Sequence, residues 1–534
     1  MLSFHLYDPS RLSPDSTLEL AYLVGAHDIA IPATITYRDS LIICERRSSE
    51  SAALALSYNT GEAGQLTLQT NLLPEREESY MLVSELARSR IRLILAKMED
   101  WALTDLDPFH PVMTKLAEAK SLFIRALTIG HTPEAEEIAH EALLKAIQCG
   151  EELSEYHAEV LLSHRLHLPN IPRTTLGCNV HPAQWSERLR TVVDTHFDYI
   201  SIPLRWRDLE PDEGEYSWQT TDRWIEWAVR TAHKPVLAGP VLNLSRNAVP
   251  DWLYIWEHDY ETLRELVAEH VRAVVTRYRR AVNVWNVVSG MNINDNFSLT
   301  YEQMMDLTRV CLLLVKKLQP NARVMLEVAQ PFAEQYAFQN GALPPLMYLE
   351  MVLESGLPVD SIGVRLQLGQ AAQGRSTRDL LQISSMLDRF ARLEHPVVIT
   401  AAGVPSDTPV PPEKSEDDDD DEGLLASAAN SAAAGYWHQP WNETLQADWL
   451  TRVTTIALSK PYVESLCWQE LYDHETSDMP YGGLINSAGM VKPALMRMGQ
   501  IRACLQTERL PREAGHMPEV TSAALQGQVG ETTP

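Results

Sequence analysis

The chain has 534 residues, too long for one small module and enough for two to four domains of roughly 100 to 200 residues, or for a large barrel with an accessory domain. Hydrophobic residues make up 45% and charged residues 22%, and no uncharged apolar run reaches the length of about 18 residues that a membrane-spanning helix needs. The formal net charge is −27 with no basic patch to counter it, so the composition argues against nucleic acid and against a membrane as partners.

The N-terminus and the cysteines bear on where the protein resides. Residues 1–20 lack the basic start and the continuous apolar stretch of a secretory signal, so we expect a cytoplasmic protein. The six cysteines are scattered, with no CxxC pair and no His/Cys spacing suited to zinc. They predict reduced thiols and a protein that uses neither a metal nor another cofactor.

The first part of the chain is predicted to contain strands and then helices. Residues 1–75 alternate β-favouring runs with Asp, Ser and Gly clusters, which predicts a small β-rich module. Residues 76–166 form a helical segment, since apolar residues recur at three- and four-residue spacing and the composition is rich in Ala, Glu and Leu. The predicted strands are 30–37, 40–44, 52–58 and 65–70, and the predicted helices are 80–101 and 133–166.

From 170 to 505, β-branched runs alternate with helical stretches such as 261–278, 301–317 and 377–393. Eight such units predict an α/β fold, a (β/α)8 TIM barrel. A doubly wound open sheet is the alternative, but the phosphate-binding glycine loop of its nucleotide-binding versions is missing. The predicted strands are 175–180, 199–204, 235–244, 282–289, 323–329, 361–368, 396–404 and 463–471.

Two segments have the composition of disordered chain. Residues 405–435 are in turn Pro-rich, acidic and Ala/Ser/Gly-rich, and they contain the seven consecutive acids of 416–422. Residues 511–534 are polar and rich in Gly, Thr and Pro. We expect a disordered loop after the seventh barrel strand and a disordered tail, with the acidic run serving solubility.

Motifs at six strands resemble those of glycoside hydrolase family 10, the endo-xylanase family. WNVVSG at 285–290 resembles that family's WDVVNE, and VVITAAGV at 397–404 resembles its segment that contains ITELDV. The resemblance extends over about 170–500 and implies the family's barrel. The remaining similar segments are LEPDEGEYSW (209–218), VPDWLY (249–254), GLPVDSIGVRLQ (356–367) and SLCWQELYD (465–473).

The resemblance also locates the family's two catalytic glutamates, and both are replaced here. Retaining hydrolysis needs an acid/base and a nucleophile whose carboxyl groups are about 5 to 5.5 Å apart. The acid/base position falls on Gly290, and the nucleophile position falls on Ala401. Neither side chain can donate a proton or attack an anomeric carbon, so the resemblance implies loss of the standard mechanism.

Other positions of the implied sugar site are changed or kept. Arg205, Asn243, Ser289, Arg365 and Gln367 are candidate ligand-binding residues at positions where the family's pattern differs. If Arg365 is unpaired, its charge favours an anionic ligand. The aromatic candidates are Trp206 and Trp468, which the family stacks against sugar, and Trp437, which lines a cleft together with Trp441 or else anchors a loop.

Three hypotheses of function follow. The first is a non-catalytic protein that binds an oligosaccharide or a protein partner. The second is an active glycosidase with relocated carboxylates, for which Glu327 and Glu470 are the best placed, with Asp473 and Asp295 behind them. The third is a structural or assembly protein, as a homo-oligomer or with a partner.

Overall fold

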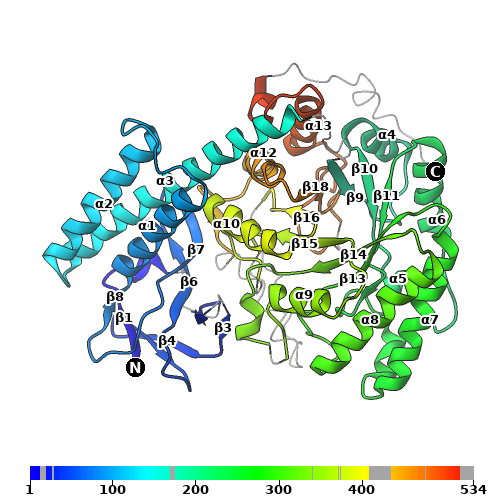
Figure 1. The fold of residues 1–534 in the computed structure, drawn as a ribbon, viewed down its shortest axis with the longest axis horizontal. Coiled ribbons are helices and arrows are strands. Elements are labelled where there is room, and N and C mark those ends of the chain that lie inside the picture. Colours follow the sequence, from blue (N-terminus) through cyan, green and yellow to red (C-terminus); the bar gives the residue numbers. More distant parts are fainter. Residues whose placement is uncertain are drawn as a thin grey trace.

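The computed structural model describes residues 1–12, 18, 20–26, 29–168, 175–339, 341–370, 372, 374–407, 434–474 and 477–516. Two small sheets and three helices form the N-terminal part, and a barrel follows (Figure 1). Most of the predicted disordered loop and tail lies outside these residues. Residues Pro511–His516, where the sequence predicts the start of the tail, form the 3-10 helix η7.

The first N-terminal sheet has four strands in the order β4-β5-β1-β8. In β5 the side chains of Ile42 and Cys44 are buried while their neighbours are more exposed, as expected of a strand with one face on the core. The strands of the N-terminal part are β1 (Leu2–His5), β2 (Tyr22–Val24), β3 (Ala30–Ile31), β4 (Thr34–Arg38), β5 (Leu41–Glu45), β6 (Ala53–Asn59), β7 (Gly64–Gln69) and β8 (Tyr80–Met81).

The second sheet contains a strand from far along the chain. Its order is β17-β7-β6-β2-β3, and β17 (Tyr436–Trp437) comes after the seventh strand of the barrel. Gly64 permits this pairing, because a Cβ there would lie 2.2 Å from the carbonyl oxygen of Tyr436. The N-terminal part and the barrel are therefore joined by backbone hydrogen bonds.

Three helices link the two parts: α1 (Leu82–Asp100), α2 (Pro111–Ile129) and α3 (Pro133–Leu166). Thr132 caps α3 by accepting from the backbone N–H of Ala135, and Pro133 occupies the first helical position. The Ala-rich buried face of α3 packs against α1, α2, α10 and α12, so this single long helix borders both parts. None of the helices in the described ranges combines the length and apolarity needed to cross a membrane.

Eight parallel strands close the barrel, which confirms the predicted fold class. Their order is β9-β10-β11-β13-β14-β15-β16-β18, with β18 pairing back to β9. The predicted strand 235–244 is interrupted at Gly239–Pro240, because proline has no N–H for a sheet ladder. The strands are β9 (Leu176–Asn179), β10 (Tyr199–Ile202), β11 (Val236–Ala238) with the short β12 (Leu242–Asn243), β13 (Val284–Ser289), β14 (Arg323–Val328), β15 (Ser361–Gln367), β16 (Val397–Gly403) and β18 (Val463–Trp468).

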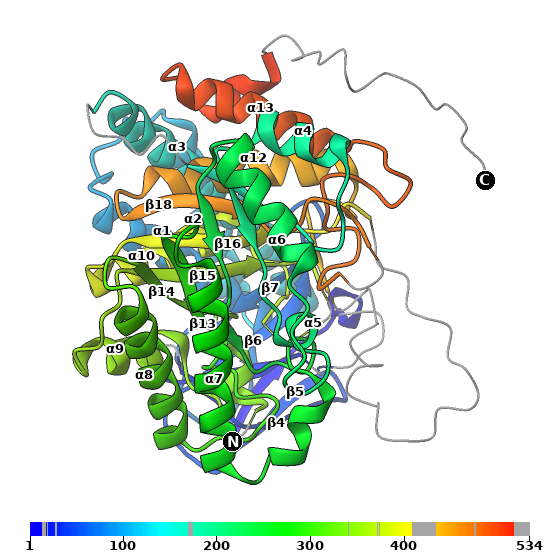
Figure 2. The ribbon, with the colours of Figure 1, turned by 90° about the vertical axis from the view of Figure 1, so that its right-hand side faces the viewer.

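Helices cover the outside of the barrel, and Figure 2 shows α6, α7 and α8 in front of its strands. Capping boxes begin two of them, with Thr300 and Gln303 at α8 and Asp379 and Gln382 at α10. The barrel helices are α4 (Glu187–His196), α5 (Trp206–Leu209), α6 (Gln219–Glu226), α7 (Tyr260–Tyr278), α8 (Tyr301–Leu318), α9 (Pro345–Glu354), α10 (Leu380–Phe390), α12 (Glu443–Ser459) and α13 (Pro493–Gln506).

A buried carboxylate of α3 connects the N-terminal part to the barrel. Glu151 accepts from the indole N–H of Trp437 at 2.6 Å and forms an ion pair with His438 at 3.1 Å. Burial acts to raise the pKa of Glu151, but its hydrogen bond and attraction to His438 lower it. Burial acts to lower the pKa of His438, and the bond to Glu151 raises it above the ordinary value of 6.5.

This pair predicts a pH-dependent stability. A raised histidine pKa stabilises the fold fully below pH 6.5, and this contribution is lost as the pH rises through the folded-state pKa. The lowered pKa of Glu151 makes its contribution complete above pH 4.5. We therefore expect the urea midpoint of the wild type to exceed that of His438→Asn most between pH 4.5 and 6.5, and the difference to shrink at higher pH. Asparagine tolerates the positive φ of 60° at this position.

His258→Asn is the matched control, since the His258 side chain is 93% exposed. It should leave the midpoint unchanged throughout this pH range. A difference between wild type and His438→Asn that does not change with pH would contradict the prediction.

Candidate functional site

A pocket lies among the carboxyl-terminal ends of the barrel strands, where barrel enzymes place their sites. Its walls carry mainly polar side chains and contain both Glu327 and Glu470. Five predicted site residues besides these two line it, namely Arg205, Asn243, Arg365, Gln367 and Ala401. The other polar lining residues are Asn179, His181, Ser201, Ser245, Asn247, Asn286, Thr400, Gln469 and Asp478.

Glu327 lies near the end of β14 and is 2% exposed. Its Oε2 accepts from the amide of Asn286 at 2.8 Å, and its Oε1 accepts from the hydroxyl of Ser289. The guanidinium of Arg365 lies 3.6 Å from Oε1. Gly363 on the next strand leaves room for this carboxylate, because a Cβ there would lie 2.9 Å from that of Glu327. Both oxygens of the carboxylate are thus engaged by the protein.

Arg365 is paired, so the condition for the predicted anionic ligand is not met at this pocket. Besides contacting Glu327, its Nη2 lies 3.2 Å from a carboxylate oxygen of Asp478. Burial acts to raise the pKa of Asp478, while Arg365, Arg375 and Arg205 lower it. The arginine therefore bridges two carboxylates at the pocket wall.

Glu470 follows β18 and belongs to a second cluster on the pocket wall. It accepts hydrogen bonds from His474 and from the hydroxyl of Ser477. The ring of His181 packs on that of His474 with 4.5 Å between centroids. Burial lowers the pKa of His181 to about 4, assisted by the charge of Arg205, so His181 is neutral at physiological pH.

The two remaining carboxylate candidates, Asp473 and Asp295, are not among the pocket residues. Asp473 pairs with the buried Lys492 at 2.5 Å and accepts from the backbone N–H of Gly483 at 2.7 Å. This pair holds the loop after β18 in place. Asp473 therefore has a structural role, and the structure brings only Glu327 and Glu470 together.

Gly290 directly follows β13, and Ala401 lies within β16. Gly290 comes directly after β13 with a φ of 66°, and its N–H donates to the carbonyl oxygen of Glu327 at 3.2 Å. Ala401 lies opposite Arg365 in the pairing of β15 with β16 and lines the pocket. Neither residue brings an ionisable group to the pocket.

The two tryptophans predicted to stack against sugar, Trp206 and Trp468, are buried and do not line the pocket. Trp206 is 2% exposed, stacks on His270 at 4.3 Å and donates to Glu210 at 2.7 Å. Trp468 is fully buried and donates to the carbonyl oxygen of Gly482. A ring with both faces packed offers no surface to a sugar.

The sequence left two roles open for Trp437 and Trp441, lining a cleft or anchoring a loop. Their burial and hydrogen bonds favour the anchor. Trp437 is 1% exposed and donates to Glu151 of α3. Trp441 is 4% exposed and donates to the carbonyl oxygen of Gly435. His438 completes the anchor through its ion pair with Glu151.

Sequence analysis did not identify Asn286 as a partner of Glu327. Alternation along a regular strand places residues separated by three positions on opposite faces, so Asn286 and Ser289 are expected to diverge. The register of β13 against β14 shifts between Asn286 and Val288, and this irregularity lets both side chains reach Glu327. Gln469 was also missed; it accepts from Gln367 at 2.6 Å.

The described residues contain no group of three His, Cys, Asp or Glu side chains arranged to hold a metal ion. All six cysteines are buried. The chemical groups that line the pocket are carboxylates, amides, hydroxyls, guanidinium groups and the imidazole of His181. Such groups bind polar ligands by hydrogen bonds.

Comparison with known proteins agrees with this barrel. The family model for Glycosyl hydrolase family 10 matches residues 172–430. Endo-1,4-beta-xylanase B of Thermotoga neapolitana is 24% identical over 224 residues, which cover 40% of this chain and 60% of that protein. Endo-1,4-beta-xylanase A of Halalkalibacterium halodurans is 24% identical over 207 residues, which cover 35% and 51% respectively. The chain thus spans about half to three fifths of the length of these relatives.

Among solved structures, xylanase 10B from Thermotoga petrophila in complex with xylobiose is similar, with a TM-score of 0.45 at 18% identity, over 66% of this chain and 97% of that one. Residues 1–171 lie outside the family match. The closed ring of eight parallel strands shows that the fold is a (β/α)8 barrel, and the family model for Glycosyl hydrolase family 10 is similar to most of this barrel.

Proposed function

We propose that the barrel binds an oligosaccharide in the pocket at its mouth without hydrolysing it. The observation that carries this proposal is the engagement of Glu327, whose two carboxylate oxygens accept from Asn286 and Ser289 beside Arg365. A nucleophile must reach an anomeric carbon, and an acid/base must exchange a proton with the substrate. A carboxylate can accept a further bond on each oxygen, but these contacts with the protein hold Glu327 in place and favour a structural role over a catalytic one.

The positions of Gly290 and Ala401 support the same proposal. By resemblance to the family's motifs these residues stand where its two glutamates stand, and they carry no carboxyl group. Loss of the nucleophile removes the covalent route, and loss of the acid removes protonation of the leaving group.

The lining of the pocket supports a carbohydrate as the ligand. Side-chain amides of Asn179, Asn243, Gln367 and Gln469 can both donate to and accept from sugar hydroxyls. The relatives named above are endo-1,4-beta-xylanases, so xylo-oligosaccharides are the first ligands to test. No Trp, Tyr or Phe is found among the residues that line the described pocket, so recognition here rests on hydrogen bonds more than on ring stacking.

A second candidate function is glycosidase activity with relocated carboxylates. It is favoured by one observation, that Glu327 and Glu470 line the same pocket. In this alternative the two glutamates would act as the acid and base pair from neighbouring walls. Glu470 would then have to exchange its bonds to His474 and Ser477 for bonds to the substrate.

One experiment separates the two. We expect the pure protein to bind xylo-oligosaccharides in calorimetry and to leave them, and a panel of aryl glycosides, unhydrolysed. Asn243→Ala should weaken binding about tenfold, since it removes hydrogen bonds to a polar ligand. Glu354→Gln, an exposed position on α9, is the control and should leave binding unchanged.

Turnover that disappears in Glu327→Gln or Glu470→Gln would establish the relocated carboxylates and overturn the proposal. Absence of both binding and turnover would exclude oligosaccharides of this class as ligands.

A further inference from the structure

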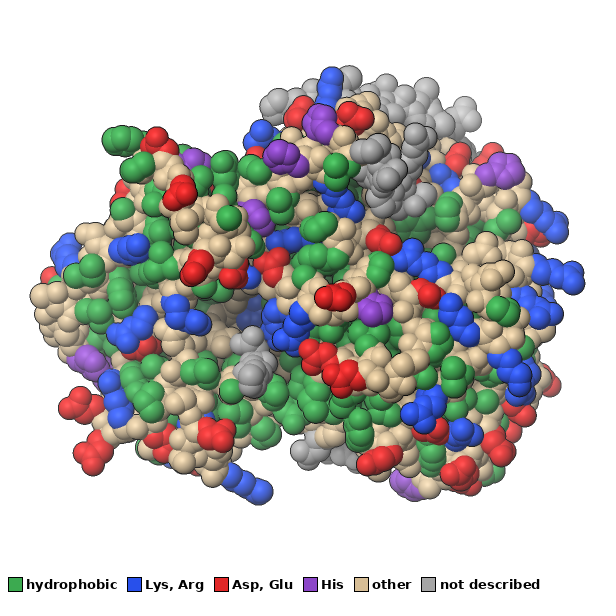
Figure 3. Space-filling model, viewed as in Figure 1, with side chains coloured by type: hydrophobic (Ala, Val, Ile, Leu, Met, Phe, Trp, Pro, Cys, Tyr) green, Lys and Arg blue, Asp and Glu red, His purple; other side chains and the backbone are tan. Residues whose placement is uncertain are grey.

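A second cleft lies between the N-terminal part and the barrel, away from the barrel mouth. Its walls come from β2, β7, α1 and α3 on one side and from α10 and the chain near Phe332 on the other. Figure 3 shows the surface hollowed between the two parts, with Lys and Arg side chains on its walls. The cleft shares no residue with the pocket at the barrel mouth.

The cleft is lined by four arginines, Arg90, Arg92, Arg378 and Arg389, and none of the described lining residues is Asp or Glu. Two of the four, Arg90 and Arg378, form ion pairs with carboxylates that do not line the cleft, Asp379 and Glu334. The chain as a whole has a net charge of −27. Arginines gathered in a concave surface attract anionic ligands locally, even where the protein as a whole is acidic.

Two buried arginines keep hydrogen-bond donors without partners. Arg378 is 3% exposed; it bonds to Tyr22, the carbonyl oxygen of Thr67 and Glu334, while its Nε has no acceptor. Arg90 is 5% exposed and pairs with Asp379, and its Nε likewise has no acceptor. Buried donors without acceptors are costly unless a ligand supplies the acceptor.

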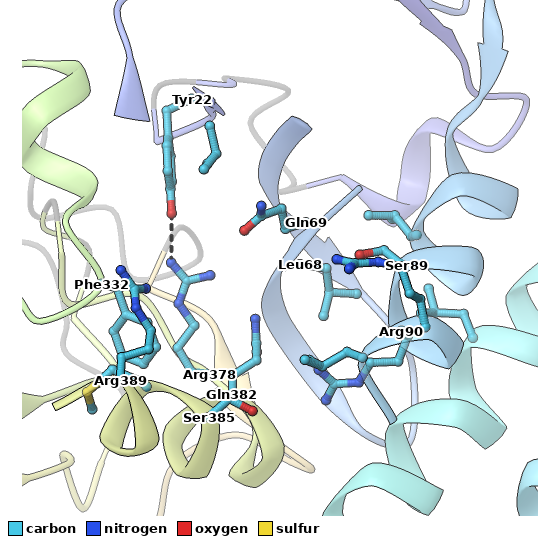
Figure 4. A pocket seen from close by; sticks show the side chains of 16 residues that line it. Tyr22, Leu68, Gln69, Ser89, Arg90, Phe332, Arg378, Gln382, Ser385 and Arg389 are labelled. Atoms are coloured by element: carbon cyan, nitrogen blue, oxygen red, sulfur yellow. Dashed lines mark hydrogen bonds between the residues drawn. The ribbon is translucent and has the colours of Figure 1, made fainter. Parts of the chain in front are cut away.

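Two further polar groups lie at the same cleft. The hydroxyl of Ser385 on α10 is buried without a partner. Arg92 donates its Nε to the neutral amide of Asn71, and no carboxylate in the described part of the chain pairs with it. Figure 4 shows Arg378, Gln382 and Ser385 on the barrel side facing Gln69, Ser89 and Arg90 across the cleft.

We propose that this cleft binds a small molecule with an anionic oxygen group, a phosphate or a carboxylate, and an apolar part. Guanidinium groups match both anions through paired N–H donors. The apolar part would contact Leu68, Leu93 and Phe332, which also line the cleft. A ligand there would touch both the N-terminal part and the barrel.

The test uses calorimetry on the full chain at low ionic strength with three probes of similar size. Phenyl phosphate and benzoate carry the two anions, and benzyl alcohol is the neutral control. We expect saturable binding of at least one anionic probe and none of benzyl alcohol. Binding of phenyl phosphate alone assigns the phosphate class, binding of benzoate alone assigns the carboxylate class, and binding of both assigns a general oxyanion site.

Two variants locate the site. Arg92→Gln should weaken binding of the anionic probe about fivefold or more, because it removes a charged donor from the cleft. Arg88→Gln is the matched control, since Arg88 is an exposed arginine on the same helix and does not line the cleft. Ser385→Ala should weaken binding without any change of charge.

No saturable binding of either anion would overturn the proposal. An equal loss in Arg88→Gln and Arg92→Gln would also overturn it, because that result indicates general attraction to the charge of α1. Unchanged thermal unfolding of each variant without ligand shows that a loss of binding is not a loss of fold.

Discussion

We expect Arg378→Met to destabilise the protein by about 3 to 5 kcal/mol, because it leaves a buried carboxylate without its cation. Arg378 and Glu334 are each 3% exposed and form a direct ion pair. The guanidinium also donates to the carbonyl oxygen of Thr67 at 2.9 Å and to the hydroxyl of Tyr22 at 3.1 Å. These contacts join the barrel to the N-terminal sheet, so the substitution weakens the junction between the two parts.

Urea denaturation measures this effect, and two further variants interpret it. Arg264→Met removes a partly exposed ion pair with Asp306 and should cost less than about 1 kcal/mol. The double variant Arg378→Met with Glu334→Gln should recover part of the lost stability, because the glutamine is neutral and still accepts from the backbone N–H of Gly374. A cost for Arg378→Met no larger than that for Arg264→Met would contradict the prediction.

We also expect Trp437→Ala to destabilise the protein by about 3 to 5 kcal/mol, as large-to-small changes of buried aromatic residues do. Trp437 is 1% exposed and belongs to the main hydrophobic core. Its indole donates to Glu151, and the guanidinium of Arg452 lies 5.4 Å from the centre of its ring. Removing the indole therefore opens a cavity and leaves a buried carboxylate with one partner fewer.

Trp437→Phe is the matched variant, because it keeps an aromatic ring and loses the N–H donor. It should cost about 1 to 3 kcal/mol, the range for leaving a buried acceptor unsatisfied. Limited proteolysis should cut Trp437→Ala faster than the wild type near β17, since the strand loses its anchor. Unchanged stability together with weakened oligosaccharide binding would instead indicate that this ring forms part of a sugar site.

The barrel could be predicted from the sequence because the information for it is local. Each of its eight strands is a short β-branched run followed by a helical stretch, and every predicted run contains a strand of the structure. The third run was predicted too long, since Pro240 interrupts its ladder. Glu327 and Glu470 could be chosen as pocket residues for the same reason, because the ends of parallel strands meet on one side of a barrel.

Side-chain partners could not be predicted in this way, because they depend on distant segments. From the sequence, Arg365 could bind an anionic ligand. In the structure it forms an ion pair with Asp478, which is 113 residues away along the chain. The residues next to Trp437 in the sequence are mostly polar, as in a loop. Its burial follows only from the pairing of β17 with β7 in the structure. Helix α2 and strand β1 were also not predicted.

The sequence by itself determined the order of the barrel strands, the closed parallel barrel and the absence of carboxyl groups at Gly290 and Ala401, because each follows from residue type and local spacing. Only the tertiary structure decided that Glu327 is held by Asn286 and Ser289, and that an arginine-lined cleft lies between the N-terminal part and the barrel. The physical reason is that strand irregularities and contacts between remote segments set the direction of side chains, and neither leaves a periodic signal in the chain.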